Sequence, residues 1–352
     1  MPRKSLKLLA IVLSVFMLAV VVSGCGGSSG SGGKSSVKTL ADYTPEKPLV
    51  LKWTDVAAVN TPKMQGANKF AEQVNKNSGG KIKIEVFGNS QLYNEKEEQE
   101  AMLAGNVHFI NPSSTKMVTF NPAYQYVDMP MLFKDEAHAK KVYESKVLDP
   151  LYKSLESKNI QVLGMFMTGF KQFSTSSHPL KKPEDFKGLK FRVQAGKVND
   201  AVFKALGAGS ATIPFGETYT ALQQGTVDSQ ENTFNNFDTQ SYAEVQKHLT
   251  ISNHGRLDHI VLTKKDWWDG LSPDIRDVLK KSIDEAVKFE WGVCEKMQDD
   301  SRKNIEKTGK VQSYKLTEEE RQVLIKAFEP VYKEFSKVIG EDVIKGIKDL
   351  EK

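Results

Sequence analysis

Residues 183–194 read PEDFKGLKFRVQ, and this stretch decides the fold. Apolar side chains occupy the odd positions from 189 to 193, and charged or polar side chains occupy the even positions from 190 to 194. Because successive side chains of a strand point to opposite faces, the alternation predicts a half-buried strand. Its polar face carries Arg192 close to the C-terminal end of the strand, where the side chain is available for binding.

The sequence on both sides of this strand alternates between further strand and helix patterns. We expect strands at residues 49–53, 81–87, 107–110, 160–167 and 188–193. We expect helices at residues 62–78, 97–104, 136–148, 150–158, 317–339 and 342–350. Capping residues support three of the helices: Thr61 before Pro62, Asn94 with Glu97, and Thr317 with Glu320. The β-α-β-α order favours an α/β protein with largely parallel sheets.

One predicted helix is too long for a single small domain. The helical pattern begins at Pro273, after Ser272, and continues to Lys307, with Gly292 as its one weak position. About 36 residues at 1.5 Å each span roughly 54 Å. A domain of about 150 residues is only roughly 35–40 Å across. The helix at 273–307 should therefore bridge two lobes, or kink.

The N-terminus has the features of an export signal. Arg3, Lys4 and Lys7 precede the apolar run 8–22, and the small residues that follow lead to Cys25. This arrangement resembles the lipobox of bacterial lipoproteins, in which the cysteine is lipidated; the alternative is an ordinary secretory signal with an incidental cysteine. We predict a signal peptide at 1–24, a Gly/Ser-rich tether at 25–45, and an extracytoplasmic protein anchored to the bacterial membrane by Cys25.

Composition narrows the class of protein further. The formal net charge of +5 falls to +2 once residues 1–24 are removed. Two cysteines exclude a disulfide framework, and we expect Cys294 to be a buried, unpaired thiol. The absence of a second long apolar run excludes a polytopic membrane protein. Basic and acidic residues alternate along the predicted helices, which is typical of solvated surfaces and does not favour nucleic-acid binding.

Motifs for other chemistry are incomplete. The six histidines show no metal-ligand spacing, so we expect no metal and no cofactor. The segment GAGSAT at 207–212 lacks the third glycine of a dinucleotide fingerprint. The segments GGSSG and GKS within residues 26–35 belong to the Gly/Ser-rich tether and lack a strand before and a helix after them.

Several motifs in order resemble the DctP family of solute-binding proteins, the extracytoplasmic component of TRAP transporters. PEDFKGLKFRV at 183–193 is followed by LGA at 206–208 and by PFGETYTALQQGTVDSQEN at 214–232. The family pattern reads P-E-D-hydrophobic-K-G-L-K-x-R-V, L-G-A and E-x-Y-x-A-L-Q-x-G-x-V-D-G-x-E-N-P. Shorter matches occur at 87–92, 105–107, 130–133, 242–249 and 268–273, so the resemblance spans nearly all of the mature chain.

The resemblance implies a periplasmic-binding-protein-like α/β fold: two α/β lobes with crossing connections, a central ligand cleft, and a long helix spanning both lobes. We assign residues 46–168 plus 258–290 to lobe I. Residues 169–257 plus 291–352 form lobe II, and the helix at 273–307 is shared. The implied function is capture of a small organic acid and its delivery to the membrane subunits of a TRAP permease. We expect the protein to be a monomer. The acid itself stays open: C4-dicarboxylates, keto acids, sugar acids and aromatic acids all fit.

The resemblance gives the binding role first to Arg192. An arginine at a strand's C-terminal end can point its planar fork into the crevice where open α/β sheets bind ligands. A carboxylate accepts two parallel hydrogen bonds from that fork, which a lysine cannot provide. In relatives a second arginine often stands in the sequence G-F-R-Q, where this chain has Lys171. We expect Lys171 to contact the ligand as a point charge or through water.

Further candidates are weaker. Asn232 matches the asparagine of the E-N-P motif, although Thr233 replaces the proline and Ser229 replaces the glycine. Other residues that would line the cleft on the lobe II side are Phe170, Tyr219, Phe234 and Asn236. On the lobe I side the candidates are Asn60, Gln91 and Ser114.

Two other functional classes remain open at this point. A ligand-sensing receptor subunit of a signalling system would bind the same acid and cannot be distinguished from a transport subunit by these residues. A secreted enzyme on the same fold would need a nucleophile, a metal or an acid/base pair, and the sequence shows none. We therefore expect a binding protein rather than an enzyme.

Overall fold

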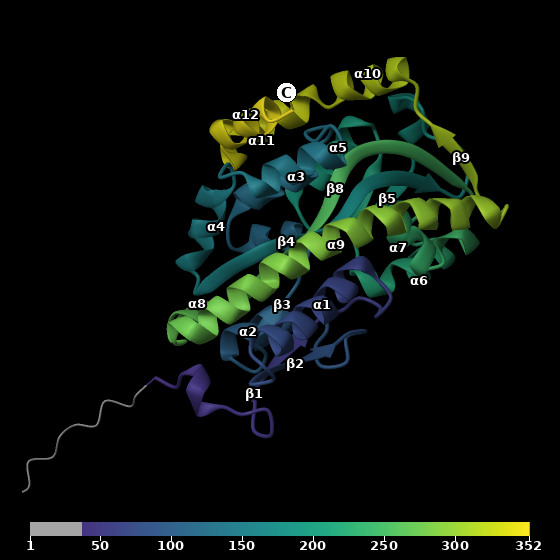
Figure 1. Cartoon of the computed structure of the whole chain (residues 1–352). Coiled ribbons are helices and arrows are strands. Elements are labelled where there is room, and N and C mark those ends of the chain that lie inside the picture. The colour runs from purple at the N-terminus through teal and green to yellow at the C-terminus, as the bar shows by residue number, and fades with distance from the viewer. Residues whose placement is uncertain (1–36, 352) are drawn as a thin grey trace, which may run out of the picture. The chain divides into compact units, whose positions relative to one another are not determined.

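The computed structural model describes residues 37–351, which are built around a nine-stranded mixed sheet. The strand order is β2-β1-β3-β8-β4-β7-β5-β6, and β9 lies beside β8 (Figure 1). The strands are β1 (Leu49–Thr54), β2 (Ile82–Phe87), β3 (Phe109–Ile110), β4 (Ile160–Thr175), β5 (Lys190–Val193), β6 (Gly209–Thr212), β7 (Ser229–Asn232), β8 (His248–Lys264) and β9 (Gln312–Lys315).

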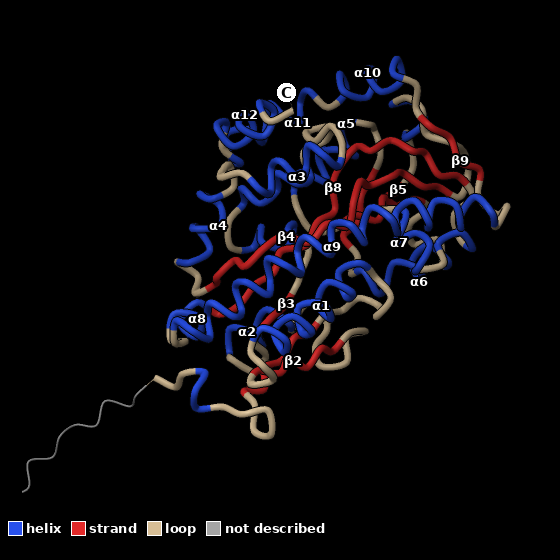
Figure 2. Tube along the Cα trace, viewed as in Figure 1, coloured by secondary structure: helices blue, strands red, loops and turns tan. Residues whose placement is uncertain are grey.

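The two ends of the sheet are parallel and its centre is antiparallel. At one end β1 pairs in parallel with β2 and β3, and at the other end β5 pairs in parallel with β6 and β7. Between them β4 and β8 form a long antiparallel pair that joins the two ends (Figure 2). The expected parallel pairing is therefore confirmed at the ends and wrong at the centre, where β8, a strand that was not predicted, runs antiparallel to β3 and β4.

Helices cover the sheet and account for most of the remaining residues. They are α1 (Pro62–Asn77), α2 (Glu98–Ala104), α3 (Glu136–Glu144), α4 (Asp149–Glu156), α5 (Lys197–Ala205), α6 (Thr218–Gln223), α7 (Phe234–Thr239), α8 (Lys265–Asp269), α9 (Pro273–Lys307), α10 (Glu318–Ala327), α11 (Glu329–Ile339) and α12 (Glu341–Asp349). Short 3-10 turns include η2 (Ser114–Thr119) and η3 (Pro122–Asp128).

The long helix is present as predicted. α9 is continuous from Pro273 to Lys307 and contains Gly292 without a break. It packs on α1, on the central strand β4 and on α7, so a single helix contacts both ends of the sheet (Figure 1). Its buried residues include Cys294, which has no disulfide partner among the residues that the structure describes.

The predicted C-terminal helix is two helices. Thr317 and Glu320 form the expected capping box, with Glu320 N donating to Thr317 Oγ1 over 3.2 Å and Thr317 N donating to Glu320 Oε2 over 2.9 Å. The helix then ends at Ala327, and α11 begins at Glu329 with Pro330 in its first turn. A proline has no N–H to donate to the carbonyl four residues earlier, which explains the break.

Two apolar clusters show how the unit is held together. One surrounds Trp53, Phe70 and Phe166 at the β1–β3 end. A larger one runs from Tyr126 across the centre to Phe191, on both sides of the boundary expected at residues 168/169. The assignment of residues to two lobes therefore stays a prediction.

The N-terminal part of the described chain belongs to the folded unit. Leu40 N donates to Asp274 Oδ2 over 2.8 Å, and Leu40 and Tyr43 pack against the cluster around Trp53. The folded unit thus includes the last residues of the tether predicted at 25–45. The signal peptide and Cys25 lie outside the described residues.

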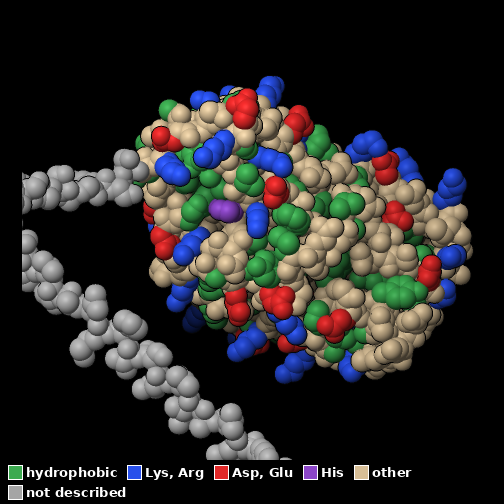
Figure 3. Space-filling model, turned by 90° about the horizontal axis from the view of Figure 1, so that it is seen from below, with side chains coloured by type: hydrophobic (Ala, Val, Ile, Leu, Met, Phe, Trp, Pro, Cys, Tyr) green, Lys and Arg blue, Asp and Glu red, His purple; other side chains and the backbone are tan. Residues whose placement is uncertain are grey.

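The described surface carries mixed charge. On the face seen in Figure 3, lysine and arginine side chains are interspersed with aspartate and glutamate. Among residues 37–351, no helix has both the length and the hydropathy needed to cross a membrane.

Candidate functional site

A cavity lies where the parallel strands from both ends of the sheet finish. It is lined by residues that follow β1 and β3, by residues that follow β5 and β7, and by residues of the central strands. Its polar and charged lining consists of Thr61, Lys63, Glu95, Glu98, Ser113, Thr168, Gln194, Asn235, Asn236 and His259. Open α/β sheets bind ligands in the crevice outside the carboxyl ends of their strands, which is where this cavity lies.

Several buried polar atoms at the cavity are free to bind. Ser113 Oγ, Gln194 Oε1 and Asn235 Oδ1 have no hydrogen-bond partner within residues 37–351. A buried polar group left unpaired costs about 1–3 kcal/mol. The lining therefore suits a ligand with several hydrogen-bonding oxygens better than an apolar one.

Arg192 is a buried cation two residues before the cavity-lining Gln194, and it is not itself one of the lining residues. Its side chain is 3% exposed, and its Nε donates to the carbonyl oxygen of Ile213 over 2.9 Å. No carboxylate of the described chain forms an ion pair with it. Burial lowers its pKa, whereas the charges of Tyr242 and of the cavity-lining Glu95 raise it. A guanidinium stays protonated in proteins, so Arg192 is a positive charge that still lacks an anion.

Asn232, the last residue of β7, and Asn236 on α7 are hydrogen-bonded to each other beside the cavity. Asn236 lines it and donates through Nδ2 to Asn232 Oδ1 over 2.7 Å. Asn232 Oδ1 also accepts from Thr233 N over 3.1 Å. The amide nitrogen of Asn232 has no acceptor among the residues that the structure describes, so it can donate to a ligand oxygen.

Lys171 lies in a different environment from Arg192. Its Nζ lies 2.5 Å from Glu231 Oε1 and 3.2 Å from Asp128 Oδ1, and it donates to Asn199 Oδ1 over 3.3 Å. These three acceptors match the three donors of an ammonium group. Lys171 therefore has no free N–H donor with which to make the expected contact with the ligand. Lys171 is the centre of a buried protein network.

The charges in this network stabilise one another. Burial alone would lower the pKa of Lys171, but Glu231 and Asp128 raise it. Burial alone would raise the pKa of Glu231, but Lys171 and His254 lower it to about 2. The ring nitrogen Nε2 of His254 lies 2.7 Å from Glu231 Oε2, which completes the set of partners.

The other predicted residues are mostly placed away from the cavity. Phe170 and Phe234 line a separate groove beside α9. Phe170 reaches this groove because it is on the face of β4 opposite to Lys171. Tyr219 is half-buried and donates to Glu244 Oε2 over 2.7 Å. Asn60 and Gln91 are exposed, and neither lines the cavity. Ser114 is buried beside the cavity-lining Ser113.

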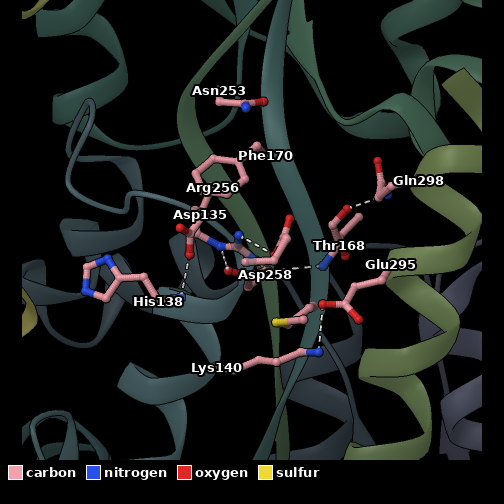
Figure 4. Close-up of polar contacts among 12 residues, drawn as sticks. Asp135, His138, Lys140, Thr168, Phe170, Asn253, Arg256, Asp258, Glu295 and Gln298 are labelled. Atoms are coloured by element: carbon pink, nitrogen blue, oxygen red, sulfur yellow. Dashed lines mark hydrogen bonds and ion pairs between the residues drawn. The ribbon is translucent and has the colours of Figure 1, made fainter. Parts of the chain in front are cut away.

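The crossing strands behind the cavity are fixed by α9 and by a buried ion pair. Gly169 adopts φ 105° at a register shift between β4 and β8, a conformation that favours glycine. Next to it, Gln298 Nε2 donates to the carbonyl oxygen of Thr168 over 2.7 Å (Figure 4). Arg256 forms two bonds to Asp258, at 2.7 and 2.9 Å, with Phe170 over its guanidinium (Figure 4). These contacts hold the segment that joins the two ends of the sheet.

Sequence reasoning missed part of the lining. Gln194 could have been predicted as a lining residue, because it follows Arg192 by two residues and so lies on the same polar face of the strand. Nothing in the local sequence marks Lys63 and Glu98 as lining residues, since each lies in the first turn of a helix, where charged residues are common. Their burial depends on how α1 and α2 pack, which a local pattern does not contain.

A substitution at Lys171 tests whether it is structural. We predict that Lys171→Met lowers the free energy of unfolding by about 3–5 kcal/mol, because it leaves Glu231 and Asp128 buried without a cation. Urea unfolding followed by circular dichroism measures this. The exposed Lys296→Met, which removes a lysine paired with Asp300 on α9, should change it by less than about 1 kcal/mol. Unchanged stability of Lys171→Met would show that the network does not depend on Lys171.

Comparison with known proteins shows the family to which the chain belongs. Residues 54–338 match the family model DctP, described as bacterial extracellular solute-binding protein, family 7. The C4-dicarboxylate-binding periplasmic protein DctP of Rhodobacter capsulatus is 38% identical over 317 residues, covering 89% of this chain and 92% of that protein.

Two solved structures are similar over most of the described chain. A TRAP periplasmic solute-binding protein from Shewanella oneidensis with bound succinate has 37% identity and a TM-score of 0.83, covering 87% of this chain and 100% of that one. The sugar acid binding protein DctPAm of Advenella mimigardefordensis, in complex with galactonate, has 30% identity and a TM-score of 0.82, covering 86% of this chain and 97% of that one. The chain belongs to the DctP family of bacterial extracellular solute-binding proteins.

Proposed function

We propose that this protein captures a small organic acid outside the cytoplasm and delivers it to the membrane subunits of a TRAP permease. The observation that carries the proposal is Arg192, a buried guanidinium with no counter-ion in residues 37–351. A buried charge is tolerated only when it is paired, so the site is complete when an anion reaches it. The unpaired polar atoms of Ser113, Gln194 and Asn235 supply the remaining contacts.

Within the organic acids, we propose a C4-dicarboxylate. The Rhodobacter relative is named for C4-dicarboxylate binding, and the Shewanella structure contains succinate. The Advenella protein, whose structure contains galactonate, is less similar in sequence. All three ligand descriptions share a carboxylate, which is the group that Arg192 is suited to hold.

The binding step makes and breaks no covalent bond. The guanidinium fork of Arg192 donates to one carboxylate, and its Nε remains bonded to Ile213, which fixes the orientation of the fork. Asn232 donates its free amide N–H, and Asn236 holds that amide in place through its 2.7 Å hydrogen bond. Because these groups come from one end of the sheet and Lys63 and Glu98 from the other, a bound acid would join the two ends.

We further propose that Cys25 carries a lipid that keeps the protein at the membrane beside its permease. The support is the sequence pattern around Cys25, with basic residues and an apolar run before it. Cys25→Ser should move the protein from the membrane fraction to the soluble fraction or the medium in a bacterial host, as an immunoblot of both fractions shows. Unchanged membrane association of Cys25→Ser would contradict the anchor and leave the binding proposal untouched.

Substitution of Arg192 tests the proposed function. Arg192→Ala should weaken succinate binding at least a hundredfold, because removing one partner of a buried charged pair costs about 3–5 kcal/mol. Isothermal titration calorimetry measures the affinity, and circular dichroism verifies that the variant is folded. Arg302→Ala is the matched control, since Arg302 is an exposed arginine of α9 paired with Glu306.

Succinate binding by Arg192→Ala at wild-type affinity would refute the assignment of Arg192. Arg192→Lys should retain part of the affinity, since it keeps the charge and loses the planar fork.

A further inference from the structure

Glu98 is the one acid of the cavity lining that the described chain leaves without a partner. It is the first residue of α2, its side chain lines the cavity, and the residue is 1% exposed. Neither of its carboxyl oxygens forms a hydrogen bond or an ion pair within residues 37–351. A fully buried carboxylate in this position would be an uncompensated charge, which is among the costliest arrangements in a protein.

The neighbouring acids are paired, unlike Glu98. Lys63 Nζ lies 2.8 Å from Asp55 Oδ1, and Lys116 Nζ lies 3.4 Å from Glu95 Oε1. Each cation near Glu98 is thus already engaged by another carboxylate.

The groups that face Glu98 from the other elements do not neutralise it either. His259 on β8 lines the same cavity, and burial followed by the charge of Lys63 lowers its pKa well below the usual value, so its ring is neutral at pH 7. Arg192 on β5 is the remaining cation near the lining, and the proposed ligand uses it. Glu98 is therefore without a counter-ion from α1, from the segment after β1, from η2, from β8 or from β5.

The environment of Glu98 favours its protonated form. Burial raises its pKa well above the usual value, and the charges of Asp55 and Glu95 raise it further, while Lys63 and Lys116 lower it in part. Below that pKa the side chain is a neutral acid with one O–H donor, and above it the side chain is an anion with no donor.

We propose that Glu98 holds a proton in the cavity and donates its O–H to the second carboxylate of a bound dicarboxylate, opposite the end held by Arg192. This inference rests on the proposed function and adds the group that selects a two-ended acid. An O–H donor facing a carboxylate forms a short, charge-assisted hydrogen bond. A monocarboxylic acid whose other end is apolar cannot form that hydrogen bond. The site then presents one fixed cation and one neutral donor, and ionised Glu98 repels the ligand.

The pH dependence of succinate affinity tests this proposal on the full chain. Calorimetry over a pH series from neutral into the alkaline range should show wild-type affinity falling as the pH rises through the pKa of Glu98, approaching about tenfold per pH unit above it. Glu98→Gln cannot ionise and keeps an N–H donor, so its affinity should stay nearly constant and match the wild type at the low end. Glu100→Gln, an exposed acid on the same helix, should keep the wild-type slope.

Each other outcome overturns the inference. A flat wild-type profile, or the same slope in Glu98→Gln as in the wild type, removes Glu98 as the titrating group. Loss of binding in a folded Glu98→Gln shows that the carboxylate, not the acid, is the binding form. Infrared spectroscopy of the unliganded wild type gives an independent result, because a carboxylic acid band that disappears in Glu98→Gln supports the proton and a carboxylate band contradicts it.

The result is separable from the proposed function. If no dicarboxylate binds any of these proteins, the proposed C4-dicarboxylate specificity fails, while the infrared result still reports on the proton.

Discussion

The central constraint of this structure is the guanidinium of Arg192, which is buried and has no carboxylate partner within residues 37–351. Arg192 is fixed by its own strand and by a hydrogen bond from Nε to Ile213, so its direction does not depend on the ligand. A buried cation without a partner destabilises the fold unless an anion arrives. The protein therefore accepts a cost in the unliganded state that a carboxylate offsets on binding.

The second buried cation, unlike Arg192, is paired with groups of the protein itself. Lys171 is as buried as Arg192, yet Glu231, Asp128 and Asn199 occupy its donors. The two residues lie on different strands of one sheet. Their surroundings make Lys171 a structural cation and leave Arg192 available to bind an anion. Arginine suits the open role because its fork matches a carboxylate, whereas the ammonium of lysine adapts to three separate acceptors.

Local patterns predicted the elements whose signals are local. The helix at 273–307, the capping box of Thr317 and Glu320, and the strand around Arg192 are all in the structure as predicted. The strand β8 showed no alternating pattern, because it is buried on both faces and contains polar residues. Two of these, His254 and Arg256, contact Glu231 and Glu136, which lie far away in the sequence. Phe170 was expected to line the cleft and instead lines the groove beside α9, in a part of β4 where the register with β8 shifts on both sides of it.

The most direct test of the account compares acids with their neutral amides. The midpoint temperature of thermal unfolding of the purified protein should rise when succinate is added and should not rise with succinamide. Only the acid supplies the anion that Arg192 lacks. A ligand at about 100 times its dissociation constant adds about 2.7 kcal/mol of stability, which shifts the unfolding midpoint measurably. Equal stabilisation by the amide, or stabilisation by neutral sugars in place of every acid, would contradict the claim that this site binds a carboxylate.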